Sequence, residues 1–77
     1  MSRTFQDANL LTWEAYASGG PHGYSERARI VFNCLSDRSR RARVVQLEAD
    51  QSEAEREVAE ASDQRLAGLL AGAQALS

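Results

Sequence analysis

The sequence is 77 residues long and 43% apolar, and nine arginines against eleven acidic residues give a formal net charge of −2 at pH 7. This length allows one small domain, residues 1–77, with a thin margin of stability. The single cysteine excludes an intramolecular disulfide, and one cysteine with one histidine argues against a metal site. Oligomerisation or docking on a larger partner therefore remains as the means of stabilising so short a chain.

The hydropathy of the chain argues against membrane insertion and export. No stretch approaches the roughly 20 apolar residues of a membrane span, and residues 1–7 contain no apolar run typical of a signal peptide. With one unpaired cysteine, we expect a cytoplasmic location.

Charge is divided unevenly along the sequence. Residues 1–47 carry seven arginines against four acids, a formal +3, while residues 48–77 carry seven acids against two arginines, a formal −5. In the first part, apolar and polar residues alternate as they do in β-strands. In the second part, apolar residues recur at the spacing of an α-helix. The sequence therefore predicts two opposed surface patches, which concern partners rather than fold.

Four segments show the alternation of apolar and polar residues that is typical of β-strands: residues 3–7, 11–18, 29–35 and 42–48. Between the second and third, three glycines and a proline predict a long loop. The polar link between the third and fourth is short, which predicts a hairpin.

The third segment has apolar residues on both faces. Ile30, Phe32 and Cys34 share one face, and Val31 and Leu35 lie on the other. This pattern predicts an interior strand that is at least partly covered on each side.

The periodicity becomes helical after residue 50. Ser52 and Glu55 fit a capping box that starts a first helix over residues 53–61. Its apolar stripe is thin, so we expect this helix to lie at the surface. Ser62 and Asp63 are predicted to interrupt the helical pattern and to start a second helix over residues 63–75.

The second predicted helix contains Gly68 and Gly72, one turn apart. Each weakens a helix by up to about 1 kcal/mol relative to alanine. The pair indicates a groove for another backbone, tight packing on the sheet, or fraying at the end of the chain.

Together these segments predict an α+β fold. An antiparallel β-meander of three to four strands, about residues 3–48, is followed by two C-terminal helices, about residues 52–75, packed on one face. The expected core consists of Trp13, Ile30, Phe32, Val45, Leu47, Val58, Leu66, Leu69 and Leu70.

The predicted hairpin carries an arginine cluster, formed by Arg38, Arg40, Arg41 and Arg43. Arginines beside the aromatic residues Trp13, Tyr16 and Tyr24 are typical of a surface that follows a nucleic-acid backbone. The sequence pI of about 5.3 lacks the high value expected of such a domain. The alternative interpretation is a solubilising turn that protects a strand edge.

Two other surfaces are candidates for partner contacts. His22 and Tyr24 lie at the tip of the long loop, and Glu53, Glu57 and Glu60 lie on the first predicted helix. The acidic helix is either an ordinary solvated face or a docking surface for a basic partner, including the arginines of a second copy.

No motif indicates catalysis or a cofactor. The glycine-rich loop matches neither the P-loop nor the dinucleotide pattern. Cys34 alternates with Ile30 and Phe32, so we expect a buried, inert thiol. The sequence therefore predicts a small non-enzymatic accessory or regulatory domain that acts through protein–protein interaction, with no cofactor, metal, membrane or small-molecule substrate. A small RNA- or DNA-binding module is the alternative.

Overall fold

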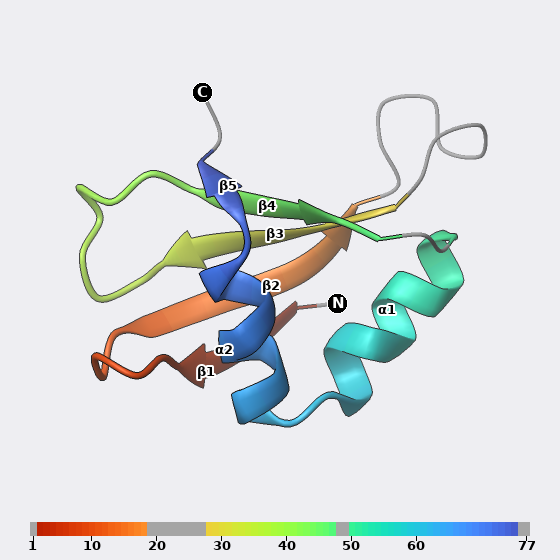
Figure 1. Ribbon diagram of the computed structural model, residues 1–77, viewed down its shortest axis with the longest axis horizontal. Helices are drawn as coiled ribbons and strands as arrows, with labels where there is room; N and C mark the ends of the chain where they lie inside the picture. Colours follow the sequence, from red (N-terminus) through yellow and green to blue (C-terminus); the bar gives the residue numbers. More distant parts are fainter. Residues whose placement is uncertain (1, 19–27, 48–49, 76–77) are drawn as a thin grey trace.

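Five antiparallel strands form one sheet in the computed structural model, and two helices pack against it (Figure 1). The structure describes residues 2–18, 28–47 and 50–75. The strands, which follow one another across the sheet in chain order, are β1 (Ser2–Gln6), β2 (Thr12–Ser18), β3 (Arg29–Cys34), β4 (Arg43–Gln46) and β5 (Gln74–Ala75). The helices α1 (Gln51–Glu60) and α2 (Asp63–Ala71) come between β4 and β5. The predicted α+β class is confirmed, with one strand more than expected.

The register of the sheet brings alternate residues to the helix side. Phe5 pairs with Trp13, Ala15 with Phe32, and Phe32 with Arg43 on the next strand. Strands β3 and β4 pair directly, which confirms the predicted hairpin. Arg43 therefore lies on the same face of the sheet as Ala15 and Phe32, at the border of the core.

The core lies between this face and the two helices. The rings of Phe5 and Phe32 meet edge to face, with centroids 5.9 Å apart. Of the predicted core residues, six are buried, namely Trp13, Ile30, Phe32, Val58, Leu66 and Leu70. The other three, Val45, Leu47 and Leu69, pack only partly buried against this cluster. Each large apolar side chain that is fully buried contributes about 1.5–3 kcal/mol, so these few residues dominate the stability of the chain.

Helix α1 lies at the surface, as its thin stripe predicts, with only Ala54 and Val58 buried. The predicted capping box was wrong. Asp50 is the N-cap, its carboxylate accepts a hydrogen bond from the Glu53 backbone N–H at 2.9 Å, and the helix begins at Gln51. Ser52 therefore lies within the first turn, because a capping side chain two residues earlier already satisfies the free amides.

Helix α2 is shorter than predicted. Ser62 caps its start, as expected, and accepts from the Arg65 backbone N–H at 3.1 Å. The helix ends at Ala71 with Gly72 as its C-cap, and Ala73 turns into the core. The next residues, Gln74 and Ala75, pair with Val44 and Arg43 as strand β5. The edge of β4 offers backbone N–H and C=O groups that would stay unpaired if α2 continued through Gln74 and Ala75.

Strand β3 is the central strand of the sheet, and residues on both of its faces are buried, as the sequence predicts. Both helices pack on the face of Ile30 and Phe32. On the other face, Val31 stands between Tyr16 and Val44 in the register and is 8% exposed. Leu35, beyond the end of β3, is exposed.

Candidate binding site at the arginine end of the sheet

The turn between β1 and β2 is organised by the carboxylate of Asp7. Its Oδ1 accepts from the backbone N–H groups of Asn9 and Leu11, at 2.8 and 3.0 Å. Its Oδ2 accepts from the indole Nε1–H of Trp13 at 2.8 Å. Leu10 takes a positive φ of 65°, which is uncommon for a branched residue and is held here by bonds on both sides of it. The turn is therefore a locally fixed structure that presents one carboxylate beside Trp13.

The connection between β3 and β4 has a similar organiser in Asp37. Its carboxylate accepts from the Ser39 hydroxyl at 2.6 Å and from the Ser39 backbone N–H at 3.1 Å. These two bonds, aided by the charge of Arg40, outweigh slight desolvation and lower the pKa of Asp37 below its ordinary value. The Arg40 Nε lies 3.5 Å from the same carboxylate. The ordered turn thus sets the direction in which Arg40 leaves the backbone.

The fold divides the predicted arginine cluster. Arg40, Arg41 and Arg43 line one hollow with Trp13 and Ala75. Arg38 instead lines a hollow with Glu14 and Asn33, which lie on the sheet face opposite the helices. Arg40 stands at the border and reaches both hollows. Three of the four arginines therefore converge on the helix side of the sheet, and Arg38 does not.

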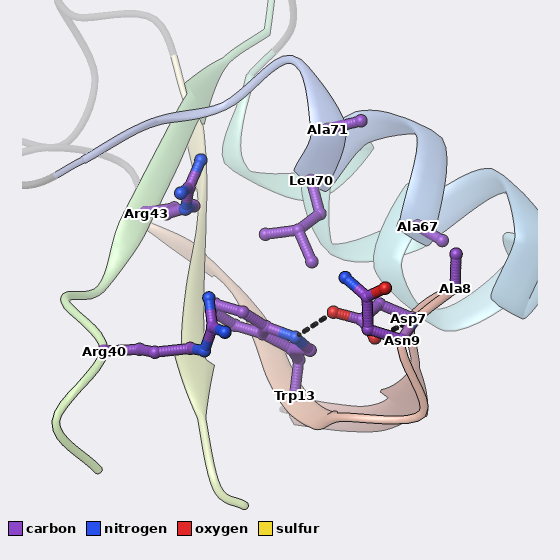
Figure 2. A pocket seen from close by; sticks show the side chains of 9 residues that line it. All are labelled: Asp7, Ala8, Asn9, Trp13, Arg40, Arg43, Ala67, Leu70 and Ala71. Atoms are coloured by element: carbon purple, nitrogen blue, oxygen red, sulfur yellow. Dashed lines mark hydrogen bonds between the residues drawn. The ribbon is translucent and has the colours of Figure 1, made fainter. Parts of the chain in front are cut away.

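A second hollow lies directly beside the first, between the β1–β2 turn, the arginines and helix α2 (Figure 2). Its volume is about 250 Å³, and that of the neighbouring one is about 270 Å³. The two share Trp13, Arg40 and Arg43. Figure 2 shows Arg40 and Arg43 on one side, Asp7 and Asn9 on the other, and Leu70 of α2 above Trp13. We call this pair of hollows the arginine groove.

The groove carries an excess of positive charge. Slight desolvation raises the pKa of Asp7, but the bonds from Trp13, Leu11 and Asn9, with the charge of Arg40, outweigh it and lower that pKa below its ordinary value. Asp7 is thus ionised at neutral pH, and it stands against three arginines. Within the described residues, Arg41 and Arg43 form no salt bridge, and Arg40 forms one with Asp37. An anionic group is the natural complement of this surface.

Of the three aromatic residues predicted beside the arginines, Trp13 is there, but it does not form an open platform. Trp13 is 3% exposed and forms the floor of the groove, so its ring faces are covered. Tyr16 pairs with Val31 on the sheet face opposite the helices. Tyr24 and His22 lie outside the described residues. Among the aromatic side chains that the structure describes, none offers an open ring face next to Arg40, Arg41 or Arg43.

The acidic candidates lie at the opposite end of the molecule. Glu53 and Glu60 are exposed on α1, and Glu57 is partly buried and bonded to the Arg65 Nε at 3.1 Å. The longest axis measures 35 Å, and along it α1 and the β3–β4 turn occupy opposite ends (Figure 1). The two charged patches therefore do not meet within one chain.

Sequence reasoning missed Asp7, Asn9 and Leu70 as parts of the site. Asp7 was predicted as the last residue of the first strand, and Leu70 only as a core residue. An aspartate two residues before an asparagine in a turn does indicate side-chain bonding to the following amides. The approach of Leu70 depends on where α2 crosses the sheet, for which the sequence holds no local signal.

The chain was compared with protein-family models, curated proteins and solved structures, and no match was found in any of the three comparisons. Among the helices formed by the described residues, none has the length and apolar character needed to cross a membrane. Within the same residues, no three His, Cys, Asp or Glu side chains gather as a metal site would require.

Proposed function

We propose that this chain is a small non-enzymatic, cytoplasmic accessory domain that binds another protein through the arginine groove. The observation that carries the proposal is the convergence of Arg40, Arg41 and Arg43 on a hollow surface with a buried tryptophan as its floor. Arginine is favoured at protein interfaces because its planar group binds carboxylates in a bidentate manner and its stem packs on apolar surface. The expected partner presents an acidic segment.

A nucleic-acid partner is supported less well by the same geometry. Single-stranded nucleic acids bind where bases stack on exposed aromatic rings along a positively charged groove. The groove has the charge but lacks an open ring among the described aromatic residues. Its volume suits a side chain or a chain end rather than a row of bases.

The test is affinity capture from the native cells with the tagged chain, with and without nuclease treatment. We expect a protein partner to be retained after nuclease and to be lost with the double substitution Arg40→Glu/Arg41→Glu. The matched pair is Arg40→Glu and Arg38→Glu, because each single substitution makes the same charge change in the same turn, and only Arg40 lines the arginine groove. Arg38→Glu should leave the partner bound. Capture that nuclease abolishes would contradict the proposal and favour the nucleic-acid module.

A second copy of the chain is one candidate for that partner. The acidic face of α1 and the arginine groove lie at opposite ends, so contact between copies would be head to tail. Sedimentation velocity at low and high salt tests this version. Association that weakens with salt and is lost with Arg40→Glu/Arg41→Glu identifies self-assembly. A chain that stays monomeric well above micromolar concentration at both salts shows that the partner of the groove is a different protein.

A further inference from the structure

The hollow beside α2 combines three kinds of chemistry within the reach of one amino-acid residue. Arg40 and Arg43 supply positive charge on one side, and the Asp7 carboxylate lies on the other (Figure 2). Leu70, with Ala67 and Ala71, forms an apolar wall on α2. A ligand that satisfies all three parts needs an anionic group, a hydrogen-bond donor and an apolar group close together.

The volume of this hollow limits the size of the ligand. Sites for cofactors and drug-sized molecules usually measure about 300–1,000 Å³. The hollow measures about 250 Å³, and the neighbouring part of the groove adds a path lined by Arg41 and Ala75. The geometry therefore suits one terminal residue of a chain whose remainder continues along the groove.

The hydrogen-bonding capacity left on the Asp7 carboxylate indicates which group of the ligand lies opposite its anionic group. Oδ1 already accepts two backbone N–H groups, while Oδ2 accepts only the Trp13 indole N–H. A carboxylate oxygen accepts two hydrogen bonds, so Oδ2 retains capacity for one more donor. An amide N–H is a donor of this kind.

We infer that the hollow binds the C-terminal residue of the partner chain. Its α-carboxylate meets the guanidinium groups of Arg40 and Arg43, its apolar side chain packs against Leu70, and its amide N–H donates to Asp7 Oδ2. A C-terminal residue fits because all three groups branch from one Cα. An internal Asp or Glu offers a carboxylate but no apolar side chain on the same Cα. The inference rests on the proposed function and specifies which part of the partner is recognised.

The test uses N-acetyl-L-leucine as the probe and the Trp13 indole N–H as the reporter. The sequence contains one tryptophan, so the indole gives a single resonance in a ¹⁵N-correlated NMR spectrum. We expect a saturable shift with a Kd of about 1 mM, the range that an efficient ligand of this size reaches. N-acetyl-L-leucinamide has a neutral carboxamide in place of the carboxylate. Its binding should be at least about 10-fold weaker, as expected from the loss of a charge-assisted pair.

Two variants and one matched control locate the binding. Arg40→Gln, at an exposed turn position, and Arg43→Gln, on β4, should each weaken N-acetyl-L-leucine binding about 10-fold, whereas Arg38→Gln should leave it unchanged. Because Arg40 is exposed, its substitution keeps the test valid if Arg43→Gln fails to fold. Equal binding of the acid and the amide overturns the inference, as does an equal response to inorganic phosphate, which would indicate an unspecific anion site.

The inference and the proposed function fail in different ways. If N-acetyl-L-leucine does not bind but Arg40→Glu/Arg41→Glu still abolishes capture of a protein partner, the C-terminal inference is wrong and the proposed function stands. If N-acetyl-L-leucine binds as expected but the same double substitution leaves partner capture intact, the proposed function is wrong and the hollow serves a free carboxylate ligand.

Discussion

The indole N–H of Trp13 donates to the carboxylate of Asp7 across a distance of 2.8 Å. This bond joins the floor of the groove to the turn that forms its rim. Since Asp7 also accepts two backbone amides, one carboxylate holds the β1–β2 turn, orients the tryptophan and balances Arg40. Stability and the shape of the candidate site are therefore linked through Asp7.

We expect stability to decrease in acid in a way that Asp7 controls. Its pKa in the folded state lies below the ordinary value of 3.8. The stabilisation is therefore fully present above that value and is lost as the pH falls through the folded-state pKa. Urea unfolding followed by circular dichroism should show a nearly constant contribution down to about pH 5 and a fall below about pH 4. Asp7→Asn should reduce this fall, and Asp37 accounts for part of the remainder. An unchanged acid dependence would contradict the role of Asp7.

Arg3 should stabilise the chain mainly by bonding to the end of α1. Its guanidinium donates to the carbonyls of Val58 and Ala61 and to the Asp63 carboxylate. Arg3→Met keeps the apolar stem but removes the donors, and it should lower the free energy of unfolding by about 1–2 kcal/mol. Asp63→Asn should cost only about 0.5 kcal/mol, because that carboxylate side chain is 61% exposed. Equal losses in chemical denaturation would show that the ion pair dominates instead.

Two substitutions, Asp50→Ala and Ser52→Ala, test where α1 begins. Asp50→Ala should lower the free energy of unfolding by about 1 kcal/mol, because it removes the N-cap acceptor for Glu53. Ser52→Ala should change it by less than about 0.5 kcal/mol, since alanine has the higher helix propensity within a helix. Thermal and urea unfolding measure both. The reverse order of the two losses would restore Ser52 as the cap.

Gly68→Ala should stabilise the chain by about 0.5–1 kcal/mol. A Cβ at Gly68 meets nothing within 4 Å, and the position is exposed, so the tight packing considered for this glycine is absent. Gly72→Ala is the control. Its Cβ would lie 3.8 Å from the Leu69 carbonyl oxygen, and the residue has an ordinary φ of −94° at the helix C-cap. We expect a smaller change there, and a lower melting temperature for Gly68→Ala would contradict the structure.

Local patterns were sufficient to predict most of the framework. Alternation over residues 11–18 predicted a strand with Trp13 in the core, and helical periodicity placed Leu66 and Leu70 there; all three are buried. The link between β3 and β4 predicted their pairing, because a short connection leaves adjacent strands little choice of partner. The acidic surface helix also followed from its own residues. These features depend on a few neighbours along the chain.

The remaining features depend on contacts between distant segments. Gln74 and Ala75 continue a helical pattern, yet they become a strand because the edge of β4 offers backbone partners. The arginines are close in sequence, but Arg38 lies in the turn after β3 and lines a hollow with Glu14 and Asn33, whereas Arg43 lies on β4 and lines the arginine groove. Trp13 is a core residue, as predicted. It also forms the floor of the groove, and this role depends on where α2 crosses the sheet and on the turn that Asp7 holds. The sequence alone thus determined the first four strands, most of the core side chains and the uneven division of charge, since periodicity and composition are local properties. The tertiary structure decided which arginines act together, because that depends on how distant backbones pack.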